Sequence, residues 1–364
     1  MRRTPALIVG GGPAGAATAL ALARAGRPHL LIERSREPGD ALCGGFLSWR
    51  TLATLAQIGV AADTLNPARV LRSRLFAGAR AAEAMLPKPA LGVSRRRLDA
   101  VLLDHAAAAG ARIERGVAAR TIAGREVAIA GDIIIADALF LASGKHEVRG
   151  SARPAPKADD PTLGLRVRIP PDPVLMKLVG DAVELHLFDR GYAGLVLQED
   201  GSANLCLAVH RSRLNEAGSP ESLLRELGDA LPQLGERLAR MPAGLSVDAV
   251  ANVPYGWRAG TTVPGVFRLG DQAAVIPSLA GEGMGIALAS GLRAAEAYCA
   301  QGPAGAVAFQ RALFRSTRRP VVAATLVRQL AESPVFAPLL VGGARALPFL
   351  TDWVARATRI ARAG

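Results

Sequence analysis

The chain has 364 residues, of which 50% are hydrophobic and 21% charged, and its formal net charge is +13. This length and composition predict a globular protein of two closely joined domains and exclude disordered and fibrous classes. Aromatic residues make up only 4% of the chain, and no stretch alternates them with the arginines that supply most of the charge. We therefore predict no nucleic-acid partner and interpret the arginines as a solvated surface.

The cysteines are Cys43, Cys206 and Cys299, which lie far apart in the sequence. Their spacing matches neither a metal site nor a disulfide framework. We therefore expect no bound metal and a reducing, cytoplasmic setting. No stretch reaches the roughly 18 consecutive apolar residues of a membrane-spanning helix, so a soluble or peripheral protein is expected.

The N-terminal region has the pattern of a dinucleotide-binding βαβ unit. An apolar strand is predicted at 6–9, an Ala-rich helix from 14 to about 25, and a second strand at 29–32. The intervening glycine-rich turn would place a pyrophosphate at the helix N-terminus. An acidic residue after the second strand would bind ribose hydroxyls and disfavour a 2′-phosphate, so the unit fits FAD or NAD. The predicted cofactor-binding residues here are Gly10, Gly12, Pro13, Ala14, Gly15, Glu33 and Arg34.

Residues 266–287, VFRLGDQAAVIPSLAGEGMGIA, distinguish FAD from NAD. This segment resembles the second FAD motif of the aromatic-hydroxylase superfamily, which also contains geranylgeranyl reductases and flavin-dependent halogenases. The resemblance implies that the aspartate of the motif binds the ribityl chain. It also implies that backbone N–H groups of the following turn, at the start of a helix reaching about residue 300, face the flavin. The implied ligands are Gly270, Asp271, Gly281, Gly283 and Met284.

Two shorter segments extend the resemblance. Residues 41–48 resemble the Cys-Gly-Gly stretch of the geranylgeranyl-reductase branch, which places Cys43 and Gly44 at the cofactor. Cys43 is interpreted either as a reactive thiol beside the flavin or as a small packing residue. Residues 94–99 resemble a segment whose arginine touches the cofactor, and that role is carried to Arg95. A helix-terminal surface charge is the alternative for Arg95.

The sequence also departs from the aromatic-hydroxylase pattern. The strand at 139–142 ends in Ser143 and Gly144, where aromatic hydroxylases carry Asp-Gly, and this ending is closer to the reductase and halogenase branches. Both residues are predicted cofactor ligands, and the electron donor is expected to be either NAD(P)H or a separate reductase. The halogenase signature is absent. The reductase branch carries a bulky tryptophan after its Gly-Tyr pair, and here Tyr192 is followed by small residues.

Residues 162–210 alternate apolar and polar side chains with turn signals between them, which predicts antiparallel strands forming a substrate wall. His186 and His210 are interpreted as structural residues without a carboxylate partner. We predict an α/β fold: a Rossmann-type FAD-binding domain, an inserted, mostly antiparallel β-sheet substrate domain and a helical C-terminus. The expected boundaries are 1–75, 94–160 and 255–300 for the first, 76–93 and 161–254 for the second, and 301–364 for the third.

The C-terminal segment is basic and apolar, with nine arginines after residue 302 against only Glu332 and Asp352. It fits an amphipathic helix lying on an anionic membrane, which would place the protein at the inner face of that membrane. It also fits a helix that covers the active site. Both interpretations remain open at the level of sequence.

The resemblance implies an FAD-dependent oxidoreductase. The favoured reaction is monooxygenation of a lipophilic aromatic or polyketide-like substrate. The alternative is geranylgeranyl-reductase-like reduction of isoprenoid double bonds, and a further alternative is a non-catalytic flavin or lipid carrier. Glu282, in the flavin turn, and Tyr192, on the substrate wall, are the candidate catalytic residues.

Overall fold

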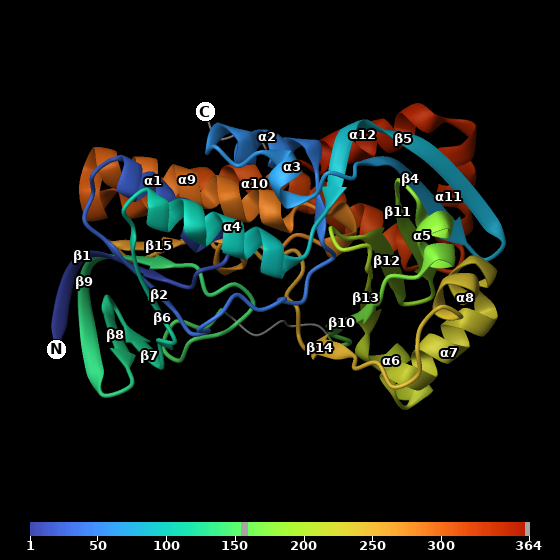
Figure 1. The fold of residues 1–364 in the computed structure, drawn as a ribbon, viewed down its shortest axis with the longest axis horizontal. Helices are drawn as coiled ribbons and strands as arrows, with labels where there is room; N and C mark the ends of the chain where they lie inside the picture. The colour runs from blue at the N-terminus through green and yellow to red at the C-terminus, as the bar shows by residue number, and fades with distance from the viewer. Residues whose placement is uncertain (154–158, 361–364) are drawn as a thin grey trace.

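The computed structural model describes residues 1–153 and 159–360. Within them the chain forms two β-sheets bridged by helices (Figure 1). The first sheet has the order β6-β2-β1-β9-β8-β7, with β15 also paired to β9. Its strands are β1 (Arg2–Val9), β2 (Leu30–Glu33), β6 (Arg112–Arg115), β7 (Thr121–Ala123), β8 (Glu126–Ile129), β9 (Asp132–Leu141) and β15 (Val266–Arg268).

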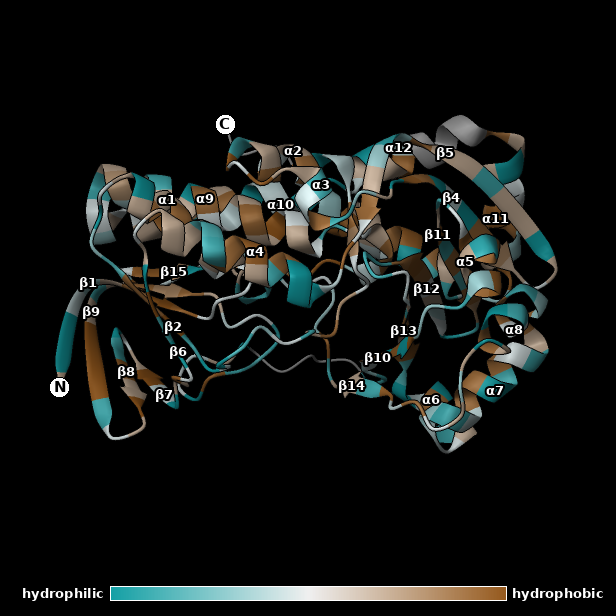
Figure 2. Cartoon of the chain, in the orientation of Figure 1, coloured by the Kyte–Doolittle hydropathy of each residue, from teal (hydrophilic) through white to brown (hydrophobic). Residues whose placement is uncertain are grey.

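The core of the first sheet is parallel, since β6, β2, β1, β9 and β15 all pair in parallel. Its central strands are apolar because they are covered on both faces, and β9 is brown along most of its length in Figure 2. Helices α1 (Pro13–Arg24), α4 (Arg95–Ala108) and α9 (Gly283–Gln301) cover one face, while the β7–β8 hairpin lies across the other (Figure 1). This arrangement is the predicted Rossmann-type domain.

The second sheet has the order β14-β10-β13-β12-β11-β4-β5-β3 and is antiparallel except at the β11–β4 pair. The antiparallel strands predicted from the alternation across residues 162–210 are therefore present, as β10 to β13. The strands of this sheet are β3 (Phe46–Leu47), β4 (Val70–Ala77), β5 (Arg80–Gly92), β10 (Thr162–Ile169), β11 (Ala182–Phe188), β12 (Gly191–Leu197), β13 (Ala203–His210) and β14 (Asp248–Val250).

One expected domain boundary is wrong. Residue 75 was expected to end the first FAD-binding segment, but it lies in the middle of β4, which pairs with β5 and β11 of the second sheet. The second sheet therefore includes β4 from Val70 onward, as well as the short β3, both within the segment expected to belong to the FAD-binding domain. The sequence of β4 does not reveal this, because its assignment depends on pairing with β11, more than a hundred residues later.

The remaining helices close the second sheet and join the two lobes. One face of the sheet packs against leucines of α7 and α8, and the other faces α10 and α11. These helices are α2 (Trp49–Gln57), α3 (Ala62–Leu65), α5 (Pro173–Val179), α6 (Arg211–Ala217), α7 (Pro220–Ala230), α8 (Pro232–Leu238), α10 (Gly305–Ala331), α11 (Phe336–Ala346) and α12 (Pro348–Ala357). No helix among the described residues is long and apolar enough to cross a membrane.

Candidate cofactor and substrate site

The turn between β1 and α1 brings backbone very close to backbone. Gly10 has a φ of +107°, and a Cβ on Gly15 would stand 1.9 Å from the carbonyl oxygen of Gly10. Only glycine fits these two positions. Gly12 caps α1 without any side-chain hydrogen bond, so the first N–H groups of the helix remain free to bind an anion.

Glu33 lies at the end of β2, beside this turn. Its Oε2 accepts a hydrogen bond from the Gly11 N–H at 2.7 Å, and its Oε1 accepts one from the Ser35 N–H at 2.9 Å. Each carboxylate oxygen has a further lone pair, so the group remains able to accept two ribose hydroxyls. The position and orientation of Glu33 fit the adenosine end of FAD.

Arg95 begins α4 and turns its side chain toward the same turn. Its guanidinium binds Asp99 through two hydrogen bonds of 2.9 and 2.7 Å, and a Cβ on Gly12 would lie 3.1 Å from its Nη2. Burial acts to lower the pKa of Arg95, but the ion pair with Asp99 outweighs it and the pKa is raised. Arg95 thus stays a cation and lies beside the glycine-rich turn rather than on the open surface, which is compatible with the predicted contact to the cofactor.

The second FAD motif forms the opposite wall. Gly270 and Gly281 have φ values of +52° and +61°, and a Cβ on Gly281 would meet the Phe46 ring at 2.8 Å. Helix α9 starts at Gly283, and no side chain caps its first N–H groups. These free N–H groups and the partial positive charge of the helix end suit the electron-rich edge of a flavin.

Cys43, Gly44, Ser143 and Gly144 lie between these two walls and line the same cavity. The carbonyl oxygen of Cys43 accepts hydrogen bonds from Asn204 Nδ2 and Cys206 Sγ, both at 3.0 Å. Ser143 Oγ donates to a backbone carbonyl three residues later, at 2.8 Å. Apart from Gly15, which packs against the backbone of Gly10, the predicted cofactor ligands thus line one cavity although they come from five separate segments.

This cavity has a volume of about 1400 Å³, which exceeds the roughly 300–1,000 Å³ of a pocket for one small ligand. One part contains the ligands described above. The other part is apolar and lies between the second sheet and the C-terminal helices. Its lining includes Leu75, Leu187, Leu195, Val275, Leu279, Leu330, Phe336, Leu340, Ala344 and Trp353. The cavity therefore has room for FAD and for an apolar second ligand.

The carboxylate of Glu282 is fully buried at the flavin turn. Its Oε2 accepts a hydrogen bond from Ser48 Oγ at 3.0 Å and lies 3.4 Å from Arg359 Nε, while Oε1 accepts one from the Ile360 N–H. Burial raises the pKa of Glu282 to about 7, and the nearby Arg359 cation opposes this rise. Because its oxygens are engaged within the protein, we interpret Glu282 as a positioning residue that ties the C-terminal segment to the turn.

Tyr192 lies on β12, as expected, but it is not among the residues that line the cavity. Its hydroxyl lies 2.6 Å from Ser278 Oγ and accepts a hydrogen bond from the Leu279 N–H at 2.8 Å. Tyr255, whose hydroxyl donates to the same Ser278 at 2.8 Å, lines the cavity instead. Neither Tyr255 nor Ser278 was predicted from the sequence, in which the one available signal is the position of Ser278 inside the second FAD motif.

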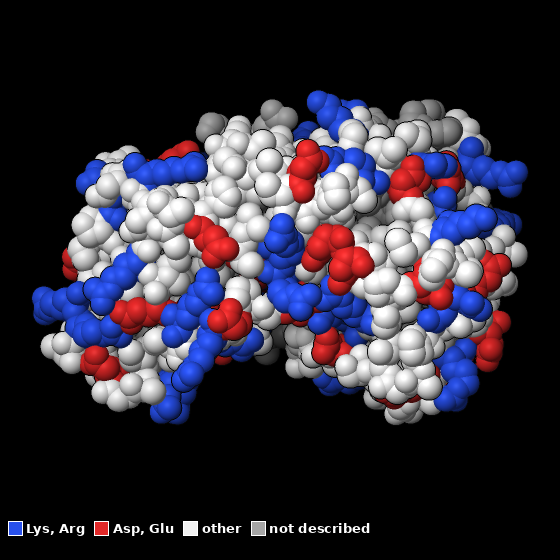
Figure 3. All heavy atoms as spheres, viewed as in Figure 1, with Lys and Arg blue, Asp and Glu red and all other residues white. Residues whose placement is uncertain are grey.

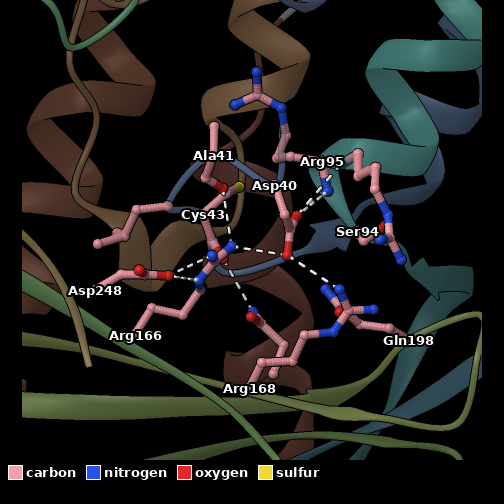
Figure 4. A network of polar contacts seen from close by, with 12 residues as sticks. Asp40, Ala41, Cys43, Ser94, Arg95, Arg166, Arg168, Gln198 and Asp248 are labelled. Atoms are coloured by element: carbon pink, nitrogen blue, oxygen red, sulfur yellow. Dashed lines mark hydrogen bonds and ion pairs between the residues drawn. The ribbon is translucent and has the colours of Figure 1, made fainter. Parts of the chain in front are cut away.

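A network of charged side chains, in which Arg166 is buried and Asp248 is exposed, joins the two lobes next to the cofactor position (Figure 4). Asp40 accepts a hydrogen bond from the Arg95 N–H at 2.9 Å and pairs with Arg166 Nη1, also at 2.9 Å. Arg166 belongs to β10 and pairs in addition with Asp248 of β14. Arg168, two residues further along β10, reaches Asp40 at 3.4 Å. This network therefore fixes the second sheet against the loop that follows β2.

The predicted absence of carboxylate partners for the two histidines is wrong. His186 Nε2 lies 3.4 Å from the buried Glu184, two residues away on the same face of β11, and His210 lies 3.2 Å from both Asp160 and Glu332. The expected structural role fits these contacts. Elsewhere on the surface, Figure 3 shows acidic and basic side chains interspersed over the visible face, as expected for a solvated surface.

Residues 3–133 match the family model of an FAD binding domain. Among curated proteins, the chain is 28% identical over 335 residues to the menaquinone reductase of Mycolicibacterium smegmatis, covering 81% of this chain and 76% of that protein. It is 27% identical over 311 residues to digeranylgeranylglycerophospholipid reductase 1 of Methanopyrus kandleri, covering 80% and 79%.

Two solved structures share the fold over nearly the whole chain. A geranylgeranyl bacteriochlorophyll reductase-like protein from Thermoplasma acidophilum matches with a TM-score of 0.74 at 20% identity, covering 98% of this chain and 97% of that one. The protein pqsL from Pseudomonas aeruginosa, described as a probable FAD-dependent monooxygenase, matches with a TM-score of 0.73 at 16% identity, covering 94% and 100%.

The fold, the cofactor cradle and the matched domain together define an FAD-dependent oxidoreductase. The resemblance to the superfamily that contains the aromatic hydroxylases and the geranylgeranyl reductases, predicted from the motifs, is thus confirmed.

Proposed function

We propose that this protein is an FAD-dependent reductase that saturates carbon–carbon double bonds in a polyprenyl lipid. The observation that carries the proposal is the apolar arm of the cavity, which begins at the flavin turn and continues between β11 and helices α10 to α12. Such an arm suits a long hydrocarbon chain. The names of the two curated relatives support the same substrate class, because menaquinone and digeranylgeranyl lipids both carry polyprenyl chains.

When bound, reduced FAD supplies a hydride to one carbon of the double bond, while the second hydrogen arrives as a proton. The chain itself binds and orients. Glu33, Arg95 and the N-terminus of α1 hold the adenosine and pyrophosphate end, and Asp271 lies where the ribityl chain is expected. Helices α11 and α12 line the apolar arm and exclude water from it.

The electron donor is either NAD(P)H or a separate reductase. Ser143 stands where aromatic hydroxylases carry an aspartate that engages both cofactors, and its hydroxyl is bonded to its own loop. We favour the separate reductase on this ground. Stopped-flow mixing of the oxidised holoprotein with NADPH tests this: rapid flavin bleaching at micromolar NADPH would contradict it.

The reaction is tested by incubating the dithionite-reduced holoprotein with menaquinone-4 under anaerobic conditions. Mass spectrometry of the extracted lipid is expected to show the gain of two hydrogens in the prenyl chain. The matched control is the oxidised holoprotein, which lacks the hydride. Reduction of the quinone ring alone, with the chain unchanged, would refute the proposal.

Monooxygenation of a lipophilic aromatic or polyketide-like substrate, favoured from sequence, is the second candidate. The specific observation for it is the space beside β12, where Gly194 and Leu195 line the cavity in place of a bulky tryptophan. This space suits a ring. Oxygenated buffer and a phenolic substrate would then give a product that has gained one oxygen atom. Turnover by either route would remove the third alternative, a non-catalytic flavin or lipid carrier.

We further propose that the cavity mouth rests on an anionic membrane. Phe336, Leu339 and Trp353 lie on α11 and α12 with half or more of their surfaces exposed, and all three line the cavity. An apolar mouth on a chain of net charge +13 suits anionic lipid, from which a prenyl chain would enter directly. Co-sedimentation with phosphatidylglycerol vesicles should fall in a Leu339→Glu variant. Equal sedimentation of both proteins would refute the contact.

A further inference from the structure

The hydroxyl groups of Tyr255, Ser278 and Tyr192 form a short chain at the edge of the apolar arm. Tyr255 Oη and Tyr192 Oη lie 2.8 and 2.6 Å from Ser278 Oγ. Tyr255 and Ser278 line the cavity, whereas Tyr192 is only 2% exposed and lies behind them. Ser278 is exposed to the cavity, and its neighbours Val275 and Leu279 are apolar. These linked hydroxyl groups therefore form a polar site in an otherwise apolar wall.

The protons of the three hydroxyl groups can be assigned from their hydrogen bonds. Tyr192 Oη accepts the Leu279 N–H at 2.8 Å, and Ser278 Oγ is its remaining partner, so Tyr192 donates its own proton to Ser278. Burial raises the pKa of Tyr192 well above its ordinary value, which keeps that proton in place. Tyr255 also donates to Ser278. Two donors fill both lone pairs of the serine oxygen.

The Ser278 proton is consequently left without an acceptor among the described residues, and Ser278 faces the cavity. Tyr255 Oη, having donated its proton, retains lone pairs that also face the cavity. A hydroxyl donor in an apolar wall is unfavourable unless a ligand or water accepts its hydrogen bond. This hydroxyl pair therefore offers a ligand one donor, from Ser278, and one acceptor, on Tyr255.

We propose that Ser278 and Tyr255 form an oxygen-binding subsite that holds the carbonyl oxygen of a quinone-headed polyprenyl lipid through the Ser278 hydroxyl. This inference rests on the proposed function, because it assumes that the apolar arm takes the prenyl chain. Ser278 lies between Asp271 and Gly281, two of the expected cofactor ligands within the second FAD motif. The carbonyl would thus be bound beside the flavin position, which fixes how far the prenyl chain extends into the arm.

The test measures binding of two probes to the oxidised holoprotein through the change in flavin fluorescence. Menaquinone-4 carries carbonyl oxygens and a prenyl chain, whereas squalene is a hydrocarbon without oxygen. Ser278→Ala is expected to weaken menaquinone-4 binding about tenfold, the loss of one hydrogen bond, and to leave squalene binding within about twofold. Ser278→Thr keeps the hydroxyl and should restore menaquinone-4 binding.

The Tyr255→Phe variant separates the acceptor role of Tyr255 from the donor role of Ser278. It leaves the Ser278 donor in place, so menaquinone-4 binding should change less than threefold. It removes the acceptor, so binding of geranylgeraniol, which donates a hydroxyl proton, should weaken about tenfold. Equal menaquinone-4 binding by wild type and Ser278→Ala would overturn the subsite but leave the proposed reductase function intact. Failure of the wild type to bind menaquinone-4, squalene and geranylgeraniol would overturn both.

Discussion

Replacing Glu282 by glutamine is expected to change how the stability of the protein depends on pH. In the folded protein burial raises the pKa of Glu282 from its ordinary value of 4.5 to about 7. The folded state therefore retains this proton across a range of pH in which the unfolded chain has released it. Stability from this group is fully present below pH 4.5 and is lost as pH rises through about 7.

The size of the effect follows from the same values. A pKa raised from 4.5 to about 7 corresponds to about 3 kcal/mol of unfolding free energy, at about 1.4 kcal/mol per pH unit. For a chain of 364 residues and an unfolding entropy of roughly 2.1 cal/mol/K per residue, this amounts to about 4 °C in Tm. Because part of the effect is already lost at pH 5, the wild type should lose about 3 °C relative to Glu282→Gln between pH 5 and pH 8.

The assay is thermal unfolding of both proteins, followed by flavin fluorescence, at half-unit steps from pH 5 to 8. Taking the difference between the two curves cancels the histidines, which titrate in the same range in both proteins. Glu83→Gln is the matched control, because the hydrogen bond from Arg74 lowers the pKa of this exposed carboxyl and moves its effect below pH 5. If the difference in Tm between the wild type and Glu282→Gln stays constant with pH, the conclusion that Glu282 is a buried, protonated carboxyl is refuted.

Three further predictions concern the cofactor cradle and its C-terminal tie. Gly15→Ala should abolish FAD retention during purification, because its Cβ would stand 1.9 Å from a backbone oxygen. Gly342→Ala, in α11 with nothing within 4 Å, should retain FAD and raise Tm by about 1 °C. Glu33→Gln should weaken FAD binding about tenfold in fluorescence titrations of the apoprotein, and an unchanged Kd would contradict its ribose role. Arg359→Met should raise the pKa of Glu282 further, because the Arg359 cation opposes the rise in that pKa caused by burial.

The cofactor-binding half of the site was predictable because each part of it is local in sequence. Gly10, Gly15 and Glu33 belong to one βαβ unit, and backbone sterics dictate the two glycines wherever such a unit occurs. Asp271 and Gly281 belong to one continuous motif in the same way. Short-range backbone geometry leaves a direct trace in the residue types, so the FAD site and the class of protein could be recognised from sequence.

The candidate catalytic residues illustrate where that reasoning stops. Tyr192 was correctly placed on a strand of the second sheet, but the strand turns its hydroxyl behind Ser278 rather than into the cavity. Glu282 was correctly placed at the flavin turn, but Arg359 of the C-terminal segment pairs with its carboxylate. Whether a side chain faces a cavity depends on what packs against it, and both partners here lie more than seventy residues away in sequence.

The sequence by itself determined the FAD-binding unit, the second FAD motif and the alternating strands of the substrate sheet, since each is encoded in a short, continuous pattern. Tertiary structure alone decided that β4 joins the second sheet, that Tyr255 rather than Tyr192 lines the cavity, and that α11 and α12 line its apolar arm. These features depend on contacts between segments distant in the chain. Such contacts are selected by complementary packing and pairing, which no local pattern records.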